Sequence, residues 1–287
     1  MPGPRRGCPV SAVLLAPGIS SRVAEGLLVA QPIRIIHENH RSKVAEVELR
    51  GERFARKVYR ARSPFLAPFL PCPARRTWNL LLRGAEKGLP FPAPIAFVGR
   101  PLSLSRRRGA VVITRWFNGD HLHLTHARER VRLADPLERR EFAAAIADAQ
   151  VALYSAGVRT TDLAPQNLLV GRIDGAWRAC LVDLDDVELD AAVDAAAIIE
   201  NLAQLGHLPE TITPRERLLG LQLFLERGGA LLLEEWIAEH SENELRRTIA
   251  ERITEFSSAK KERLRTRGAD DHAHSGFGLD ADGNPIR

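Results

Sequence analysis

The sequence predicts an α+β fold with two lobes, a strand-rich lobe followed by a helical one. The chain has 287 residues, the length of roughly two domains at about 150 residues each. Apolar and polar residues alternate in its first part, whereas beyond Gly119 apolar residues recur every three or four positions. Hydrophobic residues make up 45% of the chain and charged ones 27%, which excludes wholesale disorder.

Composition divides the chain into four regions. We expect the strand-rich lobe over residues 31–118 and the helical lobe over residues 119–267. Residues 1–30 begin with many Gly, Pro and Arg residues and are expected to be a flexible lead-in. Residues 268–287 are rich in Gly, Asp and His without an apolar period, so a disordered tail is expected there.

The elements of the first lobe follow from its alternation. Between Pro32 and Tyr59 two polar breaks divide the alternating stretch into three segments, which predicts three antiparallel strands. Apolar residues then recur at helical spacing until Gly88 and Pro90, which end a helix. The elements expected after the three strands are a helix over 74–87 and strands over 94–98 and 110–116.

The second lobe is predicted to be mainly helical. From Pro136 to Ala156 the apolar residues lie on one face of a long helix, and Gly157 ends it. Two short strand candidates follow, and the rest of the lobe has a helical pattern. These later elements are strands over 167–170 and 179–184 and helices over 191–205, 214–227, 230–240 and 242–265.

Charge and cysteine content restrict the class of protein. The 41 Lys and Arg residues against 36 Asp and Glu give a net charge of +5, which favours an anionic partner but does not choose between phosphate-bearing lipids and nucleic acids. The three cysteines have no spacing typical of zinc sites or disulfide frameworks. No apolar run reaches the roughly 18 residues of a membrane span. A cytoplasmic protein is therefore expected.

Three polar residues in the middle of the chain carry the strongest functional signal. Asn167 follows Asp162 by five positions, and Asp183 lies on the second strand of the predicted hairpin. Phosphoryl transfer needs a carboxylate that accepts the proton of the attacking hydroxyl, and oxygen ligands that hold magnesium on the nucleotide phosphates. The order and spacing of the three residues fit this chemistry. Capping of turns and helices is the alternative use of such residues.

At these positions the sequence resembles the protein-kinase-like fold. The stretch Asp162-Leu-Ala-Pro-Gln-Asn167 is similar to the kinase catalytic loop, and Val182-Asp183-Leu184-Asp185 to the metal-binding segment Asp-Phe-Gly. Within that superfamily the chain resembles the lipopolysaccharide kinases that phosphorylate Kdo and heptose sugars. This likeness extends over about residues 33–210 and rests on the strand Lys57-Val-Tyr59 and the segments 75–92, 112–119 and 201–205.

The resemblance implies a phosphotransferase that uses ATP and Mg²⁺, with a role for each matching position. Asp162 is the implied catalytic base, and Asn167 and Asp183 are the implied magnesium ligands. Lys57, on the third predicted strand, is the implied cation for the nucleotide phosphates. The backbones of Trp116 and Asn118 are implied to contact the adenine. The phosphate-binding turn lacks the usual glycines, so Arg41 and Ser42 are the implied phosphate contacts there.

Two further positions depart from the kinase pattern. Thr77 stands where a kinase helix has the Glu that pairs with the strand Lys, and Thr160 stands where the catalytic loop usually has His. A pseudokinase scaffold without turnover therefore remains an alternative, as does a kinase for small molecules of the aminoglycoside or choline type. The segment from His121 to His126 contains three His residues at a spacing that suits metal ligation, but we expect a solvent-facing or substrate-adjacent turn.

The expected substrate is a glycolipid or another hydroxyl-bearing molecule, most of all a lipopolysaccharide core sugar. Arginines in the segments 75–83 and 106–108 are candidates for contact with an anionic acceptor or with headgroups at the inner membrane surface. Peripheral contact with that membrane is thus an expected feature, and no nucleic acid partner is expected.

Overall fold

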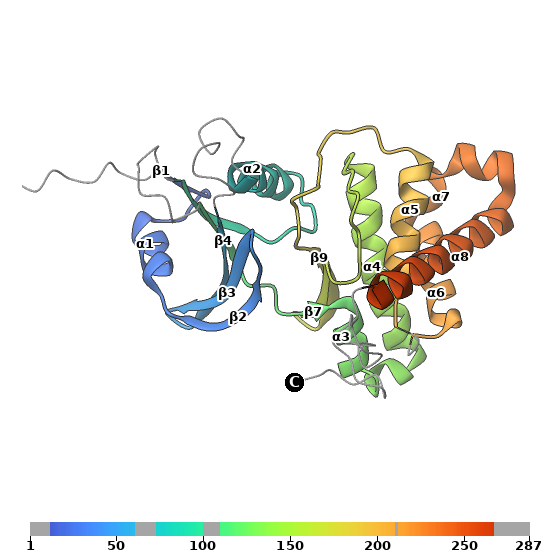
Figure 1. Cartoon of the computed structure of the whole chain (residues 1–287), viewed down its shortest axis with the longest axis horizontal. Coiled ribbons are helices and arrows are strands. Elements are labelled where there is room, and N and C mark those ends of the chain that lie inside the picture. Colours follow the sequence, from blue (N-terminus) through green and yellow to red (C-terminus); the bar gives the residue numbers. More distant parts are fainter. Residues whose placement is uncertain (1–11, 61–72, 100–109, 210–211, 267–287) are drawn as a thin grey trace, which may run out of the picture. The chain divides into compact units, whose positions relative to one another are not determined.

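The protein divides into two compact units, Met1–Trp116 and Phe117–Arg287, which are described separately below (Figure 1). The computed structural model describes residues 12–60, 73–99, 110–209 and 212–266. Unit 1 contains a β-sheet with two helices, and unit 2 is mainly helical with a small sheet. The α+β organisation predicted from the sequence is confirmed. The expected tail over 268–287 and the basic segment 106–108 lie outside the described residues.

Unit 1 is built on one antiparallel sheet of six strands. The strands are Ala12–Leu15 (β1), Pro32–Glu38 (β2), Ser42–Leu49 (β3), Glu52–Tyr59 (β4), Pro94–Gly99 (β5) and Val111–Arg115 (β6). Their order in the sheet is β1-β5-β6-β4-β3-β2. Arg50 and Gly51 both have positive φ in the two-residue turn between β3 and β4, the geometry that matches the twist of a hairpin. The strands expected from the alternating pattern are therefore β2 to β6.

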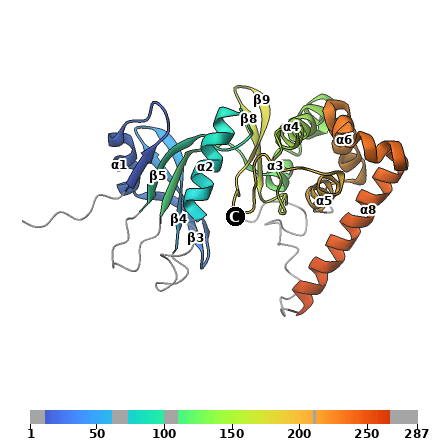
Figure 2. The ribbon, with the colours of Figure 1, turned by 90° about the horizontal axis from the view of Figure 1, so that it is seen from above.

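Two helices cover opposite faces of this sheet, as Figure 2 shows: α1 (Ser21–Val29) and α2 (Pro73–Glu86). Ala24 and Leu27 of α1 are fully buried in a core that includes Val47 and Phe54 of the sheet. On the other side Trp78 of α2 stacks on Phe97, with ring centroids 6.4 Å apart. Because side chains alternate along a strand, each face of β4 contributes to one of these two cores.

The expectation of a flexible lead-in is wrong for residues 12–29. Strand β1 pairs with β5 in antiparallel register from Ala12↔Gly99 to Leu15↔Ala96, and α1 packs on the sheet. The Gly, Pro and Arg residues on which the expectation rested lie mostly before residue 12, outside the described residues. Within residues 21–29 the apolar positions, among them Val23 and Leu28, recur at helical spacing. This pattern indicates a helix, whereas the composition of residues 1–11 indicates a flexible segment.

A half-buried arginine closes the C-terminal end of α1. Arg56, on β4, donates from Nη1 to the carbonyl oxygens of Leu27, Leu28 and Ala30, at 3.0, 3.0 and 2.9 Å. The last carbonyls of a helix have no partner within it, so an outside cation both bonds them and meets the negative end of the helix dipole. Burial lowers the pKa of Arg56 from its usual value. One side chain thereby ties α1 to the sheet.

Unit 2 contains a three-stranded sheet beside a set of helices. The strands are Asp120–His121 (β7), Leu168–Ile173 (β8) and Ala176–Leu181 (β9), in the order β7-β8-β9. The helices are Leu122–Arg128 (α3), Arg132–Ala134 (η1), Pro136–Ser155 (α4), Ala195–Gly206 (α5), Pro214–Phe224 (α6), Leu225–Gly229 (η2), Ala230–Leu232 (α7) and Glu234–Thr266 (α8). Compared with the prediction, the second strand of the hairpin ends three residues earlier, at Leu181.

Helix α4 is the central element of unit 2. Asp135 caps its N-terminus by accepting from the backbone N–H of Leu137 at 3.0 Å, and Pro136 occupies the first turn. Its buried Phe142 packs edge-on against Trp177 of β9, with centroids 5.0 Å apart. At its C-terminus Gly157 has a φ of 69°, which turns the chain into the next segment. The sequence predicts both of these ends.

The C-terminal helices are joined more closely than the sequence predicts. A π-helical turn, η2, links α6 to the short α7, and α8 runs from residue 234 to residue 266. Ser241 has a φ of 73° inside α8, so the helix bends at the place where a break between two helices was expected. In Figures 1 and 2 the part of α8 beyond this bend lies beside α5. Leu245 and Ile249 are its buried residues.

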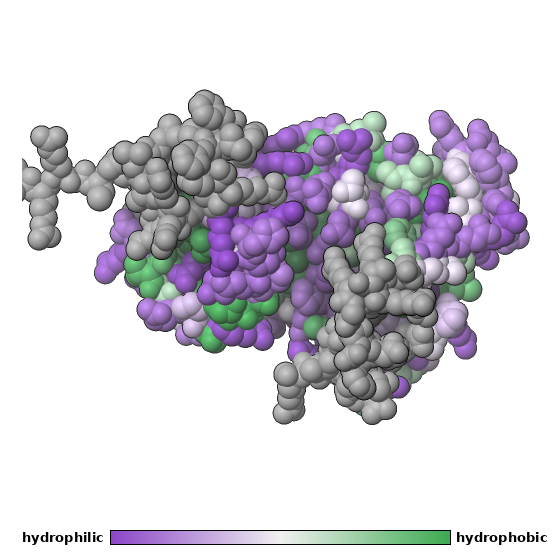
Figure 3. Space-filling view, in the orientation of Figure 1, coloured by the Kyte–Doolittle hydropathy of each residue, from purple (hydrophilic) through white to green (hydrophobic). Residues whose placement is uncertain are grey.

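On the face seen in Figure 3, the described residues are mostly hydrophilic, with separate hydrophobic patches. Among the large apolar residues that are exposed, Ile33, Ile35 and Ile36 lie on the edge strand β2. None of the helices in the described ranges is both long and apolar enough to cross a bilayer.

Replacement of Arg56 tests the link between α1 and the sheet. Arg56→Met keeps much of the aliphatic stem but leaves three carbonyl groups without their donor, so we expect a loss of about 2–4 kcal/mol in the free energy of unfolding. Urea unfolding of the full chain measures this change in the free energy of unfolding. Arg60→Met, which removes an exposed ion pair with Glu38, is the control and should cost much less. Equal costs would show that the helix end does not depend on Arg56.

Candidate active site

The segment from Gly157 to Asn167 joins α4 to the hairpin β8–β9 without regular structure. Its first part is pinned by Arg159, whose backbone exchanges two hydrogen bonds with Glu188, of 3.0 and 2.8 Å, while the two side chains form an ion pair. Val158 and Leu163 are completely buried under it. The segment therefore has a fixed path although it is neither helix nor strand.

Asp162 lies in this segment with its own backbone held on both sides. Its N–H donates to Thr160 Oγ1 at 3.2 Å, and its carbonyl oxygen accepts from Asn167 Nδ2 at 3.0 Å. Asn167 is buried, whereas Asp162 is exposed. The structure thus joins two of the predicted site residues directly, and gives Thr160 a bond of its own to the loop.

The hairpin brings Asp183 next to Asn167. In the register of β8 and β9, Leu168 pairs with Leu181, and the ladder continues with a bond of 2.9 Å from the N–H of Val182 to the carbonyl oxygen of Asn167. Asp183 is the next residue and is exposed. Because Nδ2 of Asn167 is used by Asp162, its Oδ1 is the oxygen left to accept from or ligate another group. The predicted trio therefore lies in one continuous stretch of bonded backbone.

Helix α4 anchors the hairpin through one carboxylate. Glu138 accepts from Arg172 Nη1 at 2.7 and 2.8 Å and from Trp177 Nε1 at 2.9 Å, so it bonds both strands. The hydrogen bond from Trp177, followed by that from Arg172, lowers the pKa of Glu138 below its usual value of 4.5. Burial of the thiol raises the pKa of Cys180, on the same hairpin, and keeps it unreactive.

Two glycines allow the start of unit 2 to approach β8. A Cβ on Gly171 would lie 2.2 Å from the carbonyl oxygen of Asn118, and one on Gly119 would lie 2.5 Å from that of Val170. Thr125 Oγ1 also donates to Val170 O, at 2.8 Å. Asn118, a predicted nucleotide-binding residue, is thus placed by backbone contact with the hairpin that carries Asp183.

In unit 1, Lys57 lies on the sheet face that α2 covers. Its Nζ stands 4.9 Å from the ring centroid of Tyr59, two residues along the same strand, within the range of a cation–π contact. The hydroxyl of Tyr59 bonds Thr77 Oγ1 on α2 at 3.0 Å, and both residues are buried. Thr77 is the position at which the kinase pattern has an acid, so here α2 reaches Lys57 through a tyrosine ring.

The turn that holds Arg41 and Ser42 is closed by a side chain. Asn39 Oδ1 accepts from the backbone N–H of both residues at 2.8 Å. Ser42 is buried, and Arg41 Nε donates to His40 at 3.2 Å. The two backbone amides are thus already bonded within the turn, so a phosphate contact here falls to the Arg41 side chain.

Trp116 belongs to a charged cluster that sequence reasoning missed. Buried Glu46 accepts from Arg34 Nε at 2.6 Å and from Arg53 Nη1 at 3.2 Å. Both guanidinium groups lie over the Trp116 ring, 5.6 and 5.7 Å from its centroid. Alternation along β3 and β4 places Glu46 and Arg53 on one face, but only the strand register makes them diagonal neighbours and sets Arg34 of β2 directly opposite Glu46.

The three histidines lie in β7 and α3, where a turn was expected. His121 and His123 have parallel rings 6.0 Å apart, and His123 is buried. His126 bonds Glu216 of α6 at 3.1 Å. No group of three or more His, Cys, Asp or Glu side chains among the described residues has an arrangement that could hold a metal ion. Helical spacing of Leu122, His123 and His126 explains why the segment packs as a helix.

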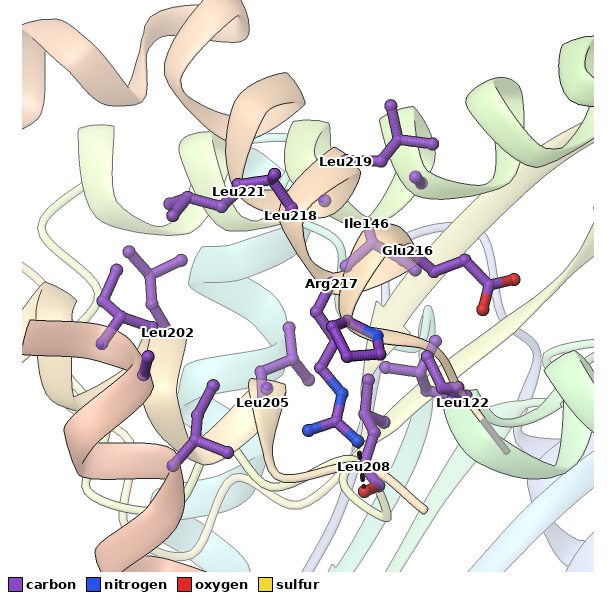
Figure 4. A pocket seen from close by; sticks show the side chains of 18 of the residues that line it. Leu122, Ile146, Leu202, Leu205, Leu208, Glu216, Arg217, Leu218, Leu219 and Leu221 are labelled. Atoms are coloured by element: carbon purple, nitrogen blue, oxygen red, sulfur yellow. Dashed lines mark hydrogen bonds between the residues drawn. The ribbon is translucent and has the colours of Figure 1, made fainter. Parts of the chain in front are cut away.

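Unit 2 also contains an apolar cavity of about 430 Å³ between α4, α5, α6 and α8, shown in Figure 4. Leucines form much of its wall, among them Leu202, Leu205 and Leu218. Arg217, at one side, donates from Nη2 to the carbonyl oxygen of Leu208 at 3.0 Å. None of the predicted site residues lines this cavity, and no sequence pattern predicted it.

A profile described as the lipopolysaccharide kinase (Kdo/WaaP) family matches residues 36–217. The chain belongs to this family. A solved structure described as WaaP in complex with acyl carrier protein matches with a TM-score of 0.55 and 18% identity, and the match covers 81% of this chain and 99% of that one. At this identity the likeness shows the fold alone, which is the protein-kinase-like bilobal fold predicted. No curated protein matches the chain.

Membership of the lipopolysaccharide kinase family confirms the predicted enzyme class. The protein is a kinase, a phosphotransferase that acts on hydroxyl groups of lipopolysaccharide sugars. The matched range begins in β2 and ends in α6, so it includes Lys57 and the whole stretch from Asp162 to Asp183.

Removal of the Glu138 carboxylate tests how the hairpin is anchored. Because the pKa of Glu138 is lowered on folding, its contribution to stability is present above about pH 4.5 and is lost as pH falls through the lowered value. The urea midpoint of wild type should therefore exceed that of Glu138→Gln at neutral pH, and the difference should shrink as the pH is lowered below 4.5. Glu141→Gln, an exposed site on the same helix, is the control. A gap independent of pH would contradict this account.

Proposed function

We propose that this lipopolysaccharide kinase transfers the γ-phosphate of ATP, with Mg²⁺, to a hydroxyl of a Kdo or heptose sugar in the lipopolysaccharide core. The observation that carries the proposal is the bonded stretch from Asp162 to Asp183, in which Asn167 holds the backbone of Asp162 and the hairpin sets Asp183 beside Asn167. Family membership supports the acceptor class.

The donor groups fit a magnesium ion. Mg²⁺ takes oxygen ligands, and the free Oδ1 of Asn167 and the exposed carboxylate of Asp183 are of that kind. When bound, the ion would neutralise charge on the nucleotide phosphates. Lys57 would add a second positive charge toward these phosphates, held in direction by the Tyr59 ring. Arg41 is a third proposed cation, and the backbones of Trp116 and Asn118 are proposed for the adenine side.

Asp162 is the proposed base. Its exposed carboxylate orients the acceptor hydroxyl and takes up its proton as the oxygen attacks phosphorus. Loss of freedom in the backbone around Asp162 reduces the entropy that the reaction must remove when base and acceptor are aligned. We place the reaction at the inner face of the cytoplasmic membrane, where a glycolipid acceptor would be presented.

Substitution of the two acids tests these roles. Asp183→Asn should lower phosphate transfer from ATP to core oligosaccharide more than 100-fold, because one charge of the metal site is lost, and Asp162→Asn should lower kcat by a similar factor. Asp174→Asn, in the turn at the other end of the same hairpin, is the matched control and should keep wild-type activity. The measurement is incorporation of labelled phosphate with and without a chelator.

The choice of acceptor decides between this proposal and the alternatives. Labelled ATP offered with core oligosaccharides, aminoglycosides and peptides should label only the first. Labelling of aminoglycosides would favour a small-molecule kinase, and nucleotide binding without transfer to any acceptor would favour a scaffold without turnover.

We further propose that an acyl carrier protein binds unit 2 and places its acyl chain in the apolar cavity. The solved WaaP structure holds such a carrier, and a long alkyl chain fits a leucine-walled cavity of about 430 Å³. Calorimetry should give tighter binding of the acylated carrier than of the carrier without a chain. Leu218→Gln, at the cavity, should weaken binding several-fold, whereas Leu231→Gln, an exposed leucine outside the cavity wall, should not.

A further inference from the structure

A glutamine on α5 bonds the backbone on both sides of Asp162. Gln204 Oε1 accepts from the N–H of Leu163 at 2.9 Å, and its Nε2 donates to the carbonyl oxygen of Thr161 at 3.0 Å. The residue lies more than 40 positions later in the chain, and its two bonds are to the residues immediately before and after Asp162. It therefore holds two peptide groups next to Asp162 at once.

A side-chain amide of this length can make both bonds at neutral pH, whereas an ionised carboxylate cannot. The amide offers a donor and an acceptor on one rigid plane. A carboxylate would accept from Leu163 but would face the carbonyl oxygen of Thr161 with a second negative oxygen. Asparagine has the same groups on a side chain one methylene shorter. At neutral pH the pair of bonds therefore distinguishes glutamine from both glutamate and asparagine.

Gln204 is presented by a helix that is itself firmly fixed. Asp194 caps the N-terminus of α5 by accepting from Ala197 N at 2.7 Å. Ile198 and Ala203 are buried in the unit, and beyond the last turn His207 Nδ1 bonds Ser257 Oγ of α8 at 3.0 Å. Residues on a regular element that is capped and packed in this way hold a partner more precisely than residues on a loop do.

These bonds complete a ring of partners around Asp162. Its own N–H is bonded by Thr160, its carbonyl by Asn167, and the next polar groups on either side by Gln204. The side chain of Leu163 is completely buried and so fixes the same stretch to the interior of unit 2. Thr160 takes the place of the His that usually braces this loop and bonds only the first of these groups among the bonds described here, so the bracing is shared with a residue of α5.

We propose that Gln204 is the positioning residue for Asp162, which it holds in the geometry needed for proton transfer without touching the reacting atoms. This inference rests on the proposed role of Asp162 as base. A base displaced by about 1 Å loses a large part of its effect, and losses near 100-fold are typical. Removal of Gln204 should therefore lower kcat while leaving nucleotide binding nearly unchanged.

Steady-state kinetics of Gln204→Leu test the proposal, because leucine has a similar size and neither bond. We expect kcat to fall about 10–100-fold with the KM for ATP within about twofold. The matched control is Gln222→Leu on α6, whose amide bonds Glu226 of the adjoining η2 at 2.8 Å. A kcat within about twofold of wild type would overturn the proposal.

A pH profile of Gln204→Glu separates positioning from a general structural effect and also serves if the leucine variant fails to fold. The introduced carboxyl group regains a donor only when it is protonated, and its ordinary pKa is about 4.3. The ratio of its kcat to that of wild type should therefore rise as pH is lowered from about 8 to about 5. A ratio that does not change with pH would overturn the donor role toward Thr161.

Amide exchange gives a readout that needs no activity. The Leu163 N–H, bonded to Gln204 in wild type, should exchange at least about tenfold faster in Gln204→Leu and at the wild-type rate in Gln222→Leu. Unchanged exchange would overturn the bracing. If wild type itself transfers no phosphate to any acceptor, the proposed function fails instead, and exchange alone then decides whether Gln204 holds this loop.

Discussion

Buried irregular backbone must find hydrogen-bond partners, and this constraint shapes the loop that carries Asp162. The segment from Gly157 to Asn167 has no helix or sheet to bond its peptide groups, yet Val158 and Leu163 are completely buried within it. An unbonded peptide group in such a place costs about 1–3 kcal/mol. Side chains of Thr160, Asn167 and Gln204 supply the partners. Folding of the loop and placement of its carboxylate are therefore the same physical event.

The hairpin β8–β9 extends this order from Asn167 to Asp183. Its ladder joins the two residues' neighbours, and Glu138 fixes both of its strands to α4. Gly119 and Gly171 let the first residues of unit 2 come into backbone contact with the same hairpin. Because the two strands of the hairpin are bonded to each other, a substitution at any of these contacts should displace the hairpin as a whole rather than one side chain. This explains why residues without chemistry of their own are distributed all around the loop.

Much of this arrangement is visible in the sequence, and the rest depends on register. Alternation between Pro32 and Tyr59 predicts three strands because a period of two residues places apolar side chains on one face of a strand and not of a helix. Asp162, Asn167 and Asp183 are found by spacing, because a short loop and a hairpin fix their separation. Glu46 and Gln204 give no such signal. A buried acid such as Glu46 becomes recognisable only when its arginine partners are known. A glutamine on a helix becomes recognisable only when the loop that it bonds is known. Helix α1 differs from these cases. Its helical pattern is present in the sequence, but the Gly, Pro and Arg residues before residue 12 favour a flexible segment when residues 1–30 are considered together.

Thr77 is the departure that most favours a scaffold without turnover, and the structure changes its meaning. In the kinase pattern an acid on the small-lobe helix is needed because it sets the direction of the strand lysine. In this chain the Tyr59 ring lies against the Lys57 ammonium, and the Tyr59 hydroxyl is bonded to Thr77. Thr77 supplies a hydroxyl that bonds Tyr59 and places no charge in this buried position. Thr77 thus fits a different way of holding Lys57 and does not by itself indicate a lost activity.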